Sequence, residues 1–89
     1  MKTRNEYKWT FEGLCPVDNG SDKYWATLET EKMVVVEDLL AYCEKHSTIP
    51  TFQEAWTTNL AGKFGGTVTL LGHHRGGVRI ISTAEAENL

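Results

Sequence analysis

The chain has 89 residues and a formal net charge of −3, with 40% hydrophobic and 24% charged residues. This composition is typical of one small globular domain and is too apolar for a disordered chain. We therefore expect a single domain over residues 1–89, with a polar, frayed tail at about 84–89. The acidic balance counts against nucleic-acid binding over a large surface, which needs clustered basic side chains to neutralise phosphates.

The sequence shows no membrane or targeting segment. The longest apolar run, Met33–Val36, is far shorter than the roughly 20 residues that a membrane span needs. No apolar segment follows the basic residues near the N-terminus, as it would in a signal peptide. These absences predict a cytoplasmic protein in which Cys15 and Cys43 are free thiols rather than a disulfide.

The first third of the chain reads as strands. Apolar and polar residues alternate over 7–11 and again over 24–28, which is the period of a half-buried strand. Between them, residues 15–22 concentrate Pro, Asp, Asn, Gly and Ser, and this composition is typical of a loop. The apolar run 33–36 predicts a third strand after a tight connection.

The middle of the chain changes to helical spacing. Residues 37–46 predict a short helix with acids at its start and basic residues at its end, as the helix dipole favours. Pro50 ends this segment, and Thr51 and Glu54 then form a T-x-x-E capping box. The second helix should extend to about Phe64 and end at the glycine pair that follows.

The last part of the chain predicts a hairpin. Residues 67–71 and 78–83 are rich in strand formers and are joined by a glycine-rich loop. The element order predicts an α+β fold, an antiparallel sheet with two helices on one face. Because such a sheet has exposed edges, we expect a cyclic homo-oligomer whose sheets join into a barrel.

A thiol and a carboxylate occupy the two ends of the predicted 15–22 loop. Cys15 could add to an electrophilic carbon as its thiolate, and Asp22 could supply the proton that the product needs. Both residues have simpler alternatives, because free cysteines are often buried as small apolar residues and aspartates often stabilise turns. For Asp18, in the same loop, an Asx turn is the preferred interpretation.

Four segments occur in the order found in the tunnelling-fold (T-fold) enzymes. They are Cys15-Pro16 with Asp22, Val36-Glu37, Phe52-Gln53-Glu54 and Arg75-Gly76-Gly77-Val78. Over residues 15–81 the chain resembles the 7-cyano-7-deazaguanine (nitrile) reductases of queuosine biosynthesis and their shorter archaeosine-type amidinotransferase relatives.

The resemblance implies an enzyme with a covalent mechanism. Cys15 would attack the nitrile carbon of a 7-deazaguanine to give a thioimide, while Asp22 protonates the nitrile nitrogen. Glu54 would hold the Watson–Crick edge of the base, because one carboxylate can accept its two adjacent N–H donors. Substrates of this family lie between subunits, so Glu54 and Cys15 could meet across an interface.

The resemblance implies weaker roles for other residues. Phe52, Gln53 and Glu37 would contact the substrate, and Arg75 is a weak candidate for binding an anion. Glu37 could equally be an acid that stabilises the helix dipole, and a solvated hairpin arginine is the simpler interpretation of Arg75. Glu54 has an alternative too, since the capping box gives it a structural role.

The sequence departs from the reductases in two places. Asp38-Leu39-Leu40-Ala41 replaces their serine and lysine cluster for NADPH, and Gln53 replaces their histidine, which assists proton delivery. We therefore expect amidine formation without a cofactor rather than NADPH-dependent reduction. The reductase remains an alternative, as does a non-catalytic oligomer that binds purines or pterins. The shorter relatives act on a nitrile-bearing tRNA, which the acidic charge disfavours here, so a small-molecule deazapurine is the expected partner.

His73-His74 raises the question of zinc, which pterin synthases of the same fold bind through histidines. Adjacent residues of a strand point to opposite faces, so these two are poorly placed to share one ion. We therefore expect no metal site.

Overall fold

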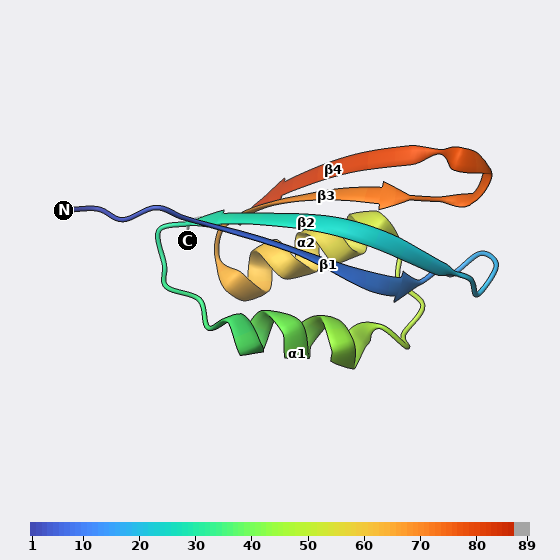
Figure 1. Cartoon of the computed structure of the whole chain (residues 1–89), viewed down its shortest axis with the longest axis horizontal. Helices are drawn as coiled ribbons and strands as arrows, with labels where there is room; N and C mark the ends of the chain where they lie inside the picture. Colours follow the sequence, from blue (N-terminus) through green and yellow to red (C-terminus); the bar gives the residue numbers. More distant parts are fainter. Residues whose placement is uncertain (87–89) are drawn as a thin grey trace.

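The computed structural model describes residues 1–86 (Figure 1). The chain forms four strands, two α-helices and one short 3₁₀ turn. In order, these are β1 (Asn5–Leu14), β2 (Ser21–Thr30), α1 (Val36–His46), α2 (Gln53–Phe64), β3 (Thr67–His73), η1 (Arg75–Gly77) and β4 (Arg79–Glu85).

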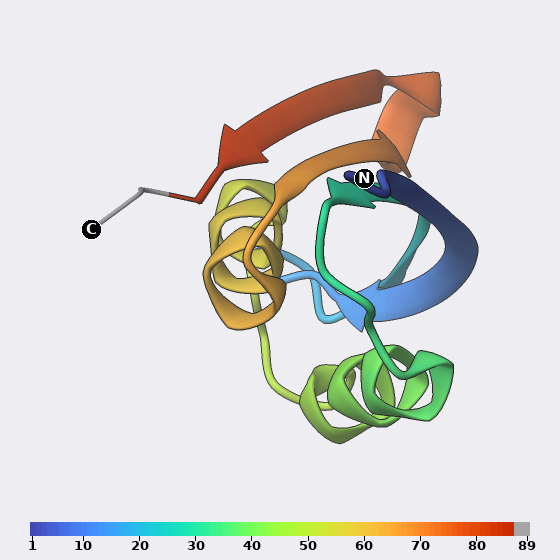
Figure 2. The same cartoon turned by 90° about the vertical axis from the view of Figure 1, so that its left-hand side faces the viewer.

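The strands form one antiparallel sheet in the order β1-β2-β3-β4. The sheet curves, and both helices lie on its concave face (Figure 2). This arrangement confirms the predicted α+β fold with two helices on one side of an antiparallel sheet.

The core follows from the period-two pattern of the strands. On β2, Tyr24, Ala26 and Leu28 face the helices and are buried, while Lys23 and Trp25 face outward. Because antiparallel partners share a face, these side chains meet the inward residues of β1 and β3. The buried apolar core consists of Phe11, Tyr24, Ala26, Leu28, Leu39, Cys43, Trp56, Leu60, Ala61, Phe64, Val68 and Leu70. Cys43 is thus a core residue.

The two predicted helices are present, but the capping box is wrong. Phe52 is the N-cap residue of α2 and makes no side-chain cap bond. The Thr51 hydroxyl instead donates to the Ile49 carbonyl at 2.8 Å. As predicted, α2 ends in the glycine pair: Gly65 adopts the left-handed conformation with φ 74° and its N–H donates to the Ala61 carbonyl.

The predicted third strand at Met33–Val36 is also wrong. This segment is an irregular connection, and its last residue, Val36, is the first residue of α1. β2 is already paired with both β1 and β3, and the segment does not add to the free edge of β1. β-branched residues form strands only where a pleated partner is present. Val34 is instead tied by its N–H to the Tyr7 hydroxyl at 3.0 Å.

The terminal hairpin is confirmed with shifted limits. Gly76 and Gly77 have φ values of 75° and 76°, which glycine adopts without strain. The polar tail does not fray at its start, because Ala84 and Glu85 belong to β4 and the Ala86 N–H donates to the Gly66 carbonyl at 3.0 Å. The remainder of the predicted tail lies outside the described residues. Within residues 1–86, no helix is long and apolar enough to cross a membrane.

Candidate active site

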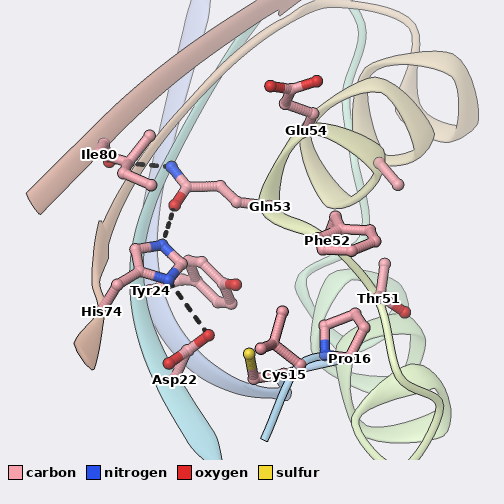
Figure 3. A pocket seen from close by; sticks show the side chains of 12 residues that line it. Cys15, Pro16, Asp22, Tyr24, Thr51, Phe52, Gln53, Glu54, His74 and Ile80 are labelled. Carbon is pink, nitrogen blue, oxygen red and sulfur yellow. Dashed lines mark hydrogen bonds and ion pairs between the residues drawn. The ribbon is translucent and has the colours of Figure 1, made fainter.

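A cavity of about 460 Å³ lies at one end of the sheet. β1 ends there, β2 begins, β3 ends, and the first turn of α2 faces them (Figure 3). The cavity is lined by Cys15, Pro16, Val17, Asp22, Tyr24, Thr51, Phe52, Gln53, Glu54, Ala55, His74 and Ile80. Five of the seven residues predicted to form the site are therefore brought together, namely Cys15, Asp22, Phe52, Gln53 and Glu54.

The loop after β1 holds Cys15 through its main chain. The Cys15 N–H donates to the Gly20 carbonyl at 2.8 Å, and the Asn19 N–H donates to the Cys15 carbonyl at 3.0 Å. Asp18 forms the predicted turn, since its Oδ1 accepts the Gly20 N–H at 2.8 Å. The Gly20 amide, the Cys15 thiol and the Arg75 charge together hold the pKa of Asp18 below its usual value. The Asp18 carboxylate is therefore ionised, and its main role in the described structure is to hold the turn that follows Cys15.

Strand register places Asp22 and Tyr24 in the cavity. Asp22 lies opposite Gly13 and Tyr24 lies opposite Phe11, so both side chains point to the helix side. Burial, then the charges of Asp22 and Cys15, raise the pKa of Tyr24 to about 12. The Tyr24 hydroxyl, which projects into the cavity in Figure 3, is therefore a neutral hydrogen-bond donor at physiological pH.

His74 is a site residue that the sequence interpretation missed. Its Nδ1 lies 3.2 Å from Asp22 Oδ2, and its Nε2 lies 2.5 Å from Gln53 Oε1. The signal was present in the strand parity: Val68, Leu70 and Gly72 face inward, and His74 continues that series. His73, on the opposite face, packs on Trp25 with ring centroids 4.5 Å apart. The expectation that the two histidines point to opposite faces is confirmed.

Gln53 lines the cavity, but its polar atoms are bound within the protein. Its Nε2 contacts the carbonyls of Leu70 at 3.2 Å and Ile80 at 2.8 Å and the Ser82 hydroxyl at 3.2 Å. Its Oε1 contacts His74. The amide therefore joins α2 to β3 and β4 at the wall of the cavity.

A main-chain bond fixes the start of α2 against β1. The Thr51 N–H donates to the Leu14 carbonyl at 3.1 Å, next to Cys15. Phe52, which is 61% exposed, lies at the rim of the cavity. Glu54 is exposed and lines the cavity at the end away from Cys15 (Figure 3). Cys15 and Glu54 thus line one cavity of the single chain.

Two predicted residues lie outside the cavity lining. Glu37 is an exposed acid in the first turn of α1, where it suits the helix dipole. Arg75 is 84% exposed at its side chain, and its guanidinium lies 3.9 Å from Asp18 Oδ2. Arg75 thus joins the two loops beside the cavity without lining it. Among residues 1–86 no group of three potential metal ligands occurs.

Comparison with known proteins identifies the fold. The crystal structure of the archaeosine synthase QueF-Like in its apo form superposes on this chain with a TM-score of 0.84, covering 97% of this chain and 95% of that one at 17% sequence identity. No family model matches the chain. No curated protein matches it by sequence. The structural match shows that this chain has the tunnelling fold.

Proposed function

We propose that this protein is an enzyme that converts the nitrile of a 7-deazaguanine into an amidine through a thioimide on Cys15. The observation that carries the proposal is that Cys15 and Asp22, from the two ends of one loop, line the same cavity as Glu54 from the first turn of α2. A volume of about 460 Å³ lies within the usual range for small-molecule sites. The match to an archaeosine synthase of the same fold supports this substrate class.

The first step joins the Cys15 sulfur to the nitrile carbon. The thiol reacts as its thiolate, and its proton is released to solvent as the C–S bond forms. One bond of the C–N triple bond breaks, and its electron pair moves to nitrogen. Asp22 protonates that nitrogen, so the thiol hydrogen is balanced by the hydrogen gained on the thioimide.

The second step releases the product. Ammonia or another amine attacks the thioimide carbon, the C–S bond breaks, and its electron pair returns to Cys15. The amine loses one proton and the thiolate regains one. The net reaction is the addition of an amine to a nitrile, and it needs neither an oxidant nor a reductant.

Glu54 and Phe52 are proposed to recognise the base. The Glu54 carboxylate can accept two N–H groups of a guanine-like edge at once. It is free to do so because it makes no helix-cap bond. The exposed Phe52 ring at the rim offers a flat apolar surface for the heterocycle. The nucleophile and the recognition group would then bind opposite ends of one ligand.

The residues in the region of the reductases' cofactor segment do not fit NADPH. After Glu37, the first turn of α1 continues with the acidic Asp38, the buried Leu39 and the exposed Leu40, none of which can bind phosphates. Gln53 does not count against reduction, because His74 brings an imidazole into the same cavity. Amidine formation is therefore favoured by the α1 sequence alone.

The test is adduct formation. Incubation with 7-cyano-7-deazaguanine should add the mass of the substrate and produce thioimide absorbance, and Cys15→Ala should abolish both. Cys43→Ala is the matched control, because Cys43 is buried in the core away from the cavity. The adduct should disappear on addition of ammonia, with release of an amidine. An absence of adduct in the parent protein would refute the proposal and favour a binding protein without turnover.

We also propose that the chain forms a homo-oligomer, as expected from its sheet edges. In the described single chain, β1 and β4 each pair on one side only. Ile81 on β4 is 70% exposed, and Val78 just before it is 54% exposed. Pairing of these edges between copies would complete the sheet and cover the apolar side chains. A monomer in sedimentation velocity at micromolar concentration would contradict this.

A further inference from the structure

We infer that Gln53 is a positioning residue that sets the tautomer of His74, so that the His74–Asp22 pair stores the proton used by the site. The inference rests on two successive contacts at the cavity wall, from Gln53 to His74 and from His74 to Asp22 (Figure 3). Its catalytic use rests on the proposed function. The protonation state itself does not, and it can be measured on the free protein.

The orientation of the Gln53 amide is determined by its surroundings. One end of the amide faces the carbonyl oxygens of Leu70 and Ile80, which can only accept hydrogen bonds. That end must be the NH₂ group, because the reverse orientation would place three carbonyl oxygens against one another. The oxygen of the amide therefore faces His74.

This orientation fixes one nitrogen of the His74 ring. Since Gln53 Oε1 can only accept, His74 Nε2 must carry a hydrogen and donate it. A neutral imidazole has one N–H, so its Nδ1 would then be a bare lone pair. That lone pair would face Asp22 Oδ2 at 3.2 Å, and an ionised carboxylate offers only lone pairs as well.

The contact with Asp22 therefore needs one additional proton. Either His74 is an imidazolium beside an ionised Asp22, or a neutral His74 faces a protonated Asp22. The two side chains are only 19% and 13% exposed, so water cannot readily separate two facing lone pairs. The other polar group against the ring is Tyr24, which is neutral at physiological pH. The pair thus retains a proton between Nδ1 and Oδ2.

The stored proton has a use in each proposed step. Asp22 gives it to the nitrile nitrogen as the C–S bond forms, which leaves Nδ1 and the carboxylate as two facing acceptors. The pair then takes a proton back from the amine that attacks the thioimide carbon. The two transfers cancel, so the pair ends the reaction as it began.

Nitrogen NMR of the three histidines tests the inference directly. Long-range proton–nitrogen spectra of histidine-labelled protein at neutral pH should show a protonated Nε2 for His74. His46 provides an internal reference of the opposite kind, because its Nδ1 lies 2.8 Å from the Tyr42 carbonyl and must donate. His73, exposed beside Trp25, reports an unconstrained ring. A His74 with bare Nε2 and protonated Nδ1, like His46, would overturn the inference.

Two variants separate the contribution of each partner. In Gln53→Met the constraint on Nε2 is lost, and His74 should change to the tautomer that donates from Nδ1 to Asp22. In Asp22→Asn the additional proton is no longer needed, and His74 should become neutral with Nε2 still protonated. An unchanged Nε2–H in Gln53→Met would overturn the positioning role. If that variant does not fold, the spectrum of the parent protein still decides the tautomer.

Adduct kinetics then tests the catalytic use. His74→Gln should slow adduct formation about 100-fold, as expected for loss of general acid catalysis, while the affinity for 7-deazaguanine, which has no nitrile, stays unchanged. An unchanged rate would show that the stored proton is not used. A parent protein with the Nε2–H tautomer but no adduct would refute the proposed function and leave the tautomer assignment standing.

Discussion

Replacing Gly72 with alanine should break the contact between Gln53 and His74. A methyl group at Gly72 would overlap Gln53 Oε1 and would lie 2.8 Å from both His74 Nε2 and Tyr24 Cε1. Gly72 lies opposite Tyr24 in the centre of the sheet, so the main chain cannot move aside. The glycine is therefore required by the close approach of these three side chains.

The expected loss of stability has two parts. Overpacking in a filled site costs about 1–3 kcal/mol. Separating Gln53 from His74 leaves polar atoms unpaired at a further cost of about 1–3 kcal/mol. The two parts sum to about 2–6 kcal/mol, and the middle value of about 4 kcal/mol corresponds to a fall of roughly 16–32 °C in Tm for a domain of this size.

Thermal unfolding followed by circular dichroism measures this fall. Gly62→Ala is the matched control, because nothing lies within 4 Å of a methyl group at that helical position. It should raise stability by about 0.5–1 kcal/mol through helix propensity. If Gly72→Ala unfolds at the parent Tm and His74 keeps its Nε2–H signal, the side chains do not meet over Gly72 as described.

Three further measurements test the site. Burial raises the pKa of Tyr24 to about 12, so the folded state disfavours the ionised phenol. As the pH rises from about 10 to about 12, the free energy of unfolding should therefore fall by up to about 2.7 kcal/mol relative to that of Tyr24→Phe. Parallel pH profiles of the two proteins would contradict this. Burial also raises the pKa of the Cys43 thiol, so a thiol reagent should rapidly label only Cys15 in the native protein. Rapid labelling of the Cys15→Ala variant would be inconsistent with the described core. Glu54→Ala should change the free energy of unfolding by less than about 1 kcal/mol. In calorimetry the same variant should bind 7-deazaguanine about 10–100-fold more weakly. A large loss of stability would instead indicate that Glu54 caps α2.

The elements that the sequence predicted correctly are those with a complete local signal. Alternation over β1 and β2, the acids at the start of α1 and the glycines after α2 each act within a few residues. Met33–Val36 misled the prediction because strand formation depends on pairing with a neighbouring strand, which no local pattern encodes, and here the segment is the connection that leads into α1. The T-x-x-E pattern at Thr51 failed for a related reason: the chain before α2 is held by β1, and its hydroxyl turns back to Ile49.

The site residues that belong to short sequence motifs could be predicted. Those that depend on how β2 and β3 pair could not. Cys15, Asp22 and Glu54 were found through their motifs. His74 belongs to none, and its importance follows only from the pairing that brings the end of β3 beside Asp22. The glutamine that replaces the reductase histidine was interpreted as a loss of proton chemistry. In the structure that glutamine contacts an imidazole from another strand.

The hydrogen bond from Thr51 to Leu14 separates the geometry of the cavity from the identity of the side chains around it. It joins two main-chain atoms, so substitution at either position, proline at 51 excepted, leaves the distance between the thiol loop and the start of α2 unchanged. The residues around the cavity can therefore be exchanged while the hydrogen bond that sets the spacing of the two segments is kept. Main-chain contacts of this kind are compatible with a superposition along nearly the whole length of a structural neighbour at only 17% identity.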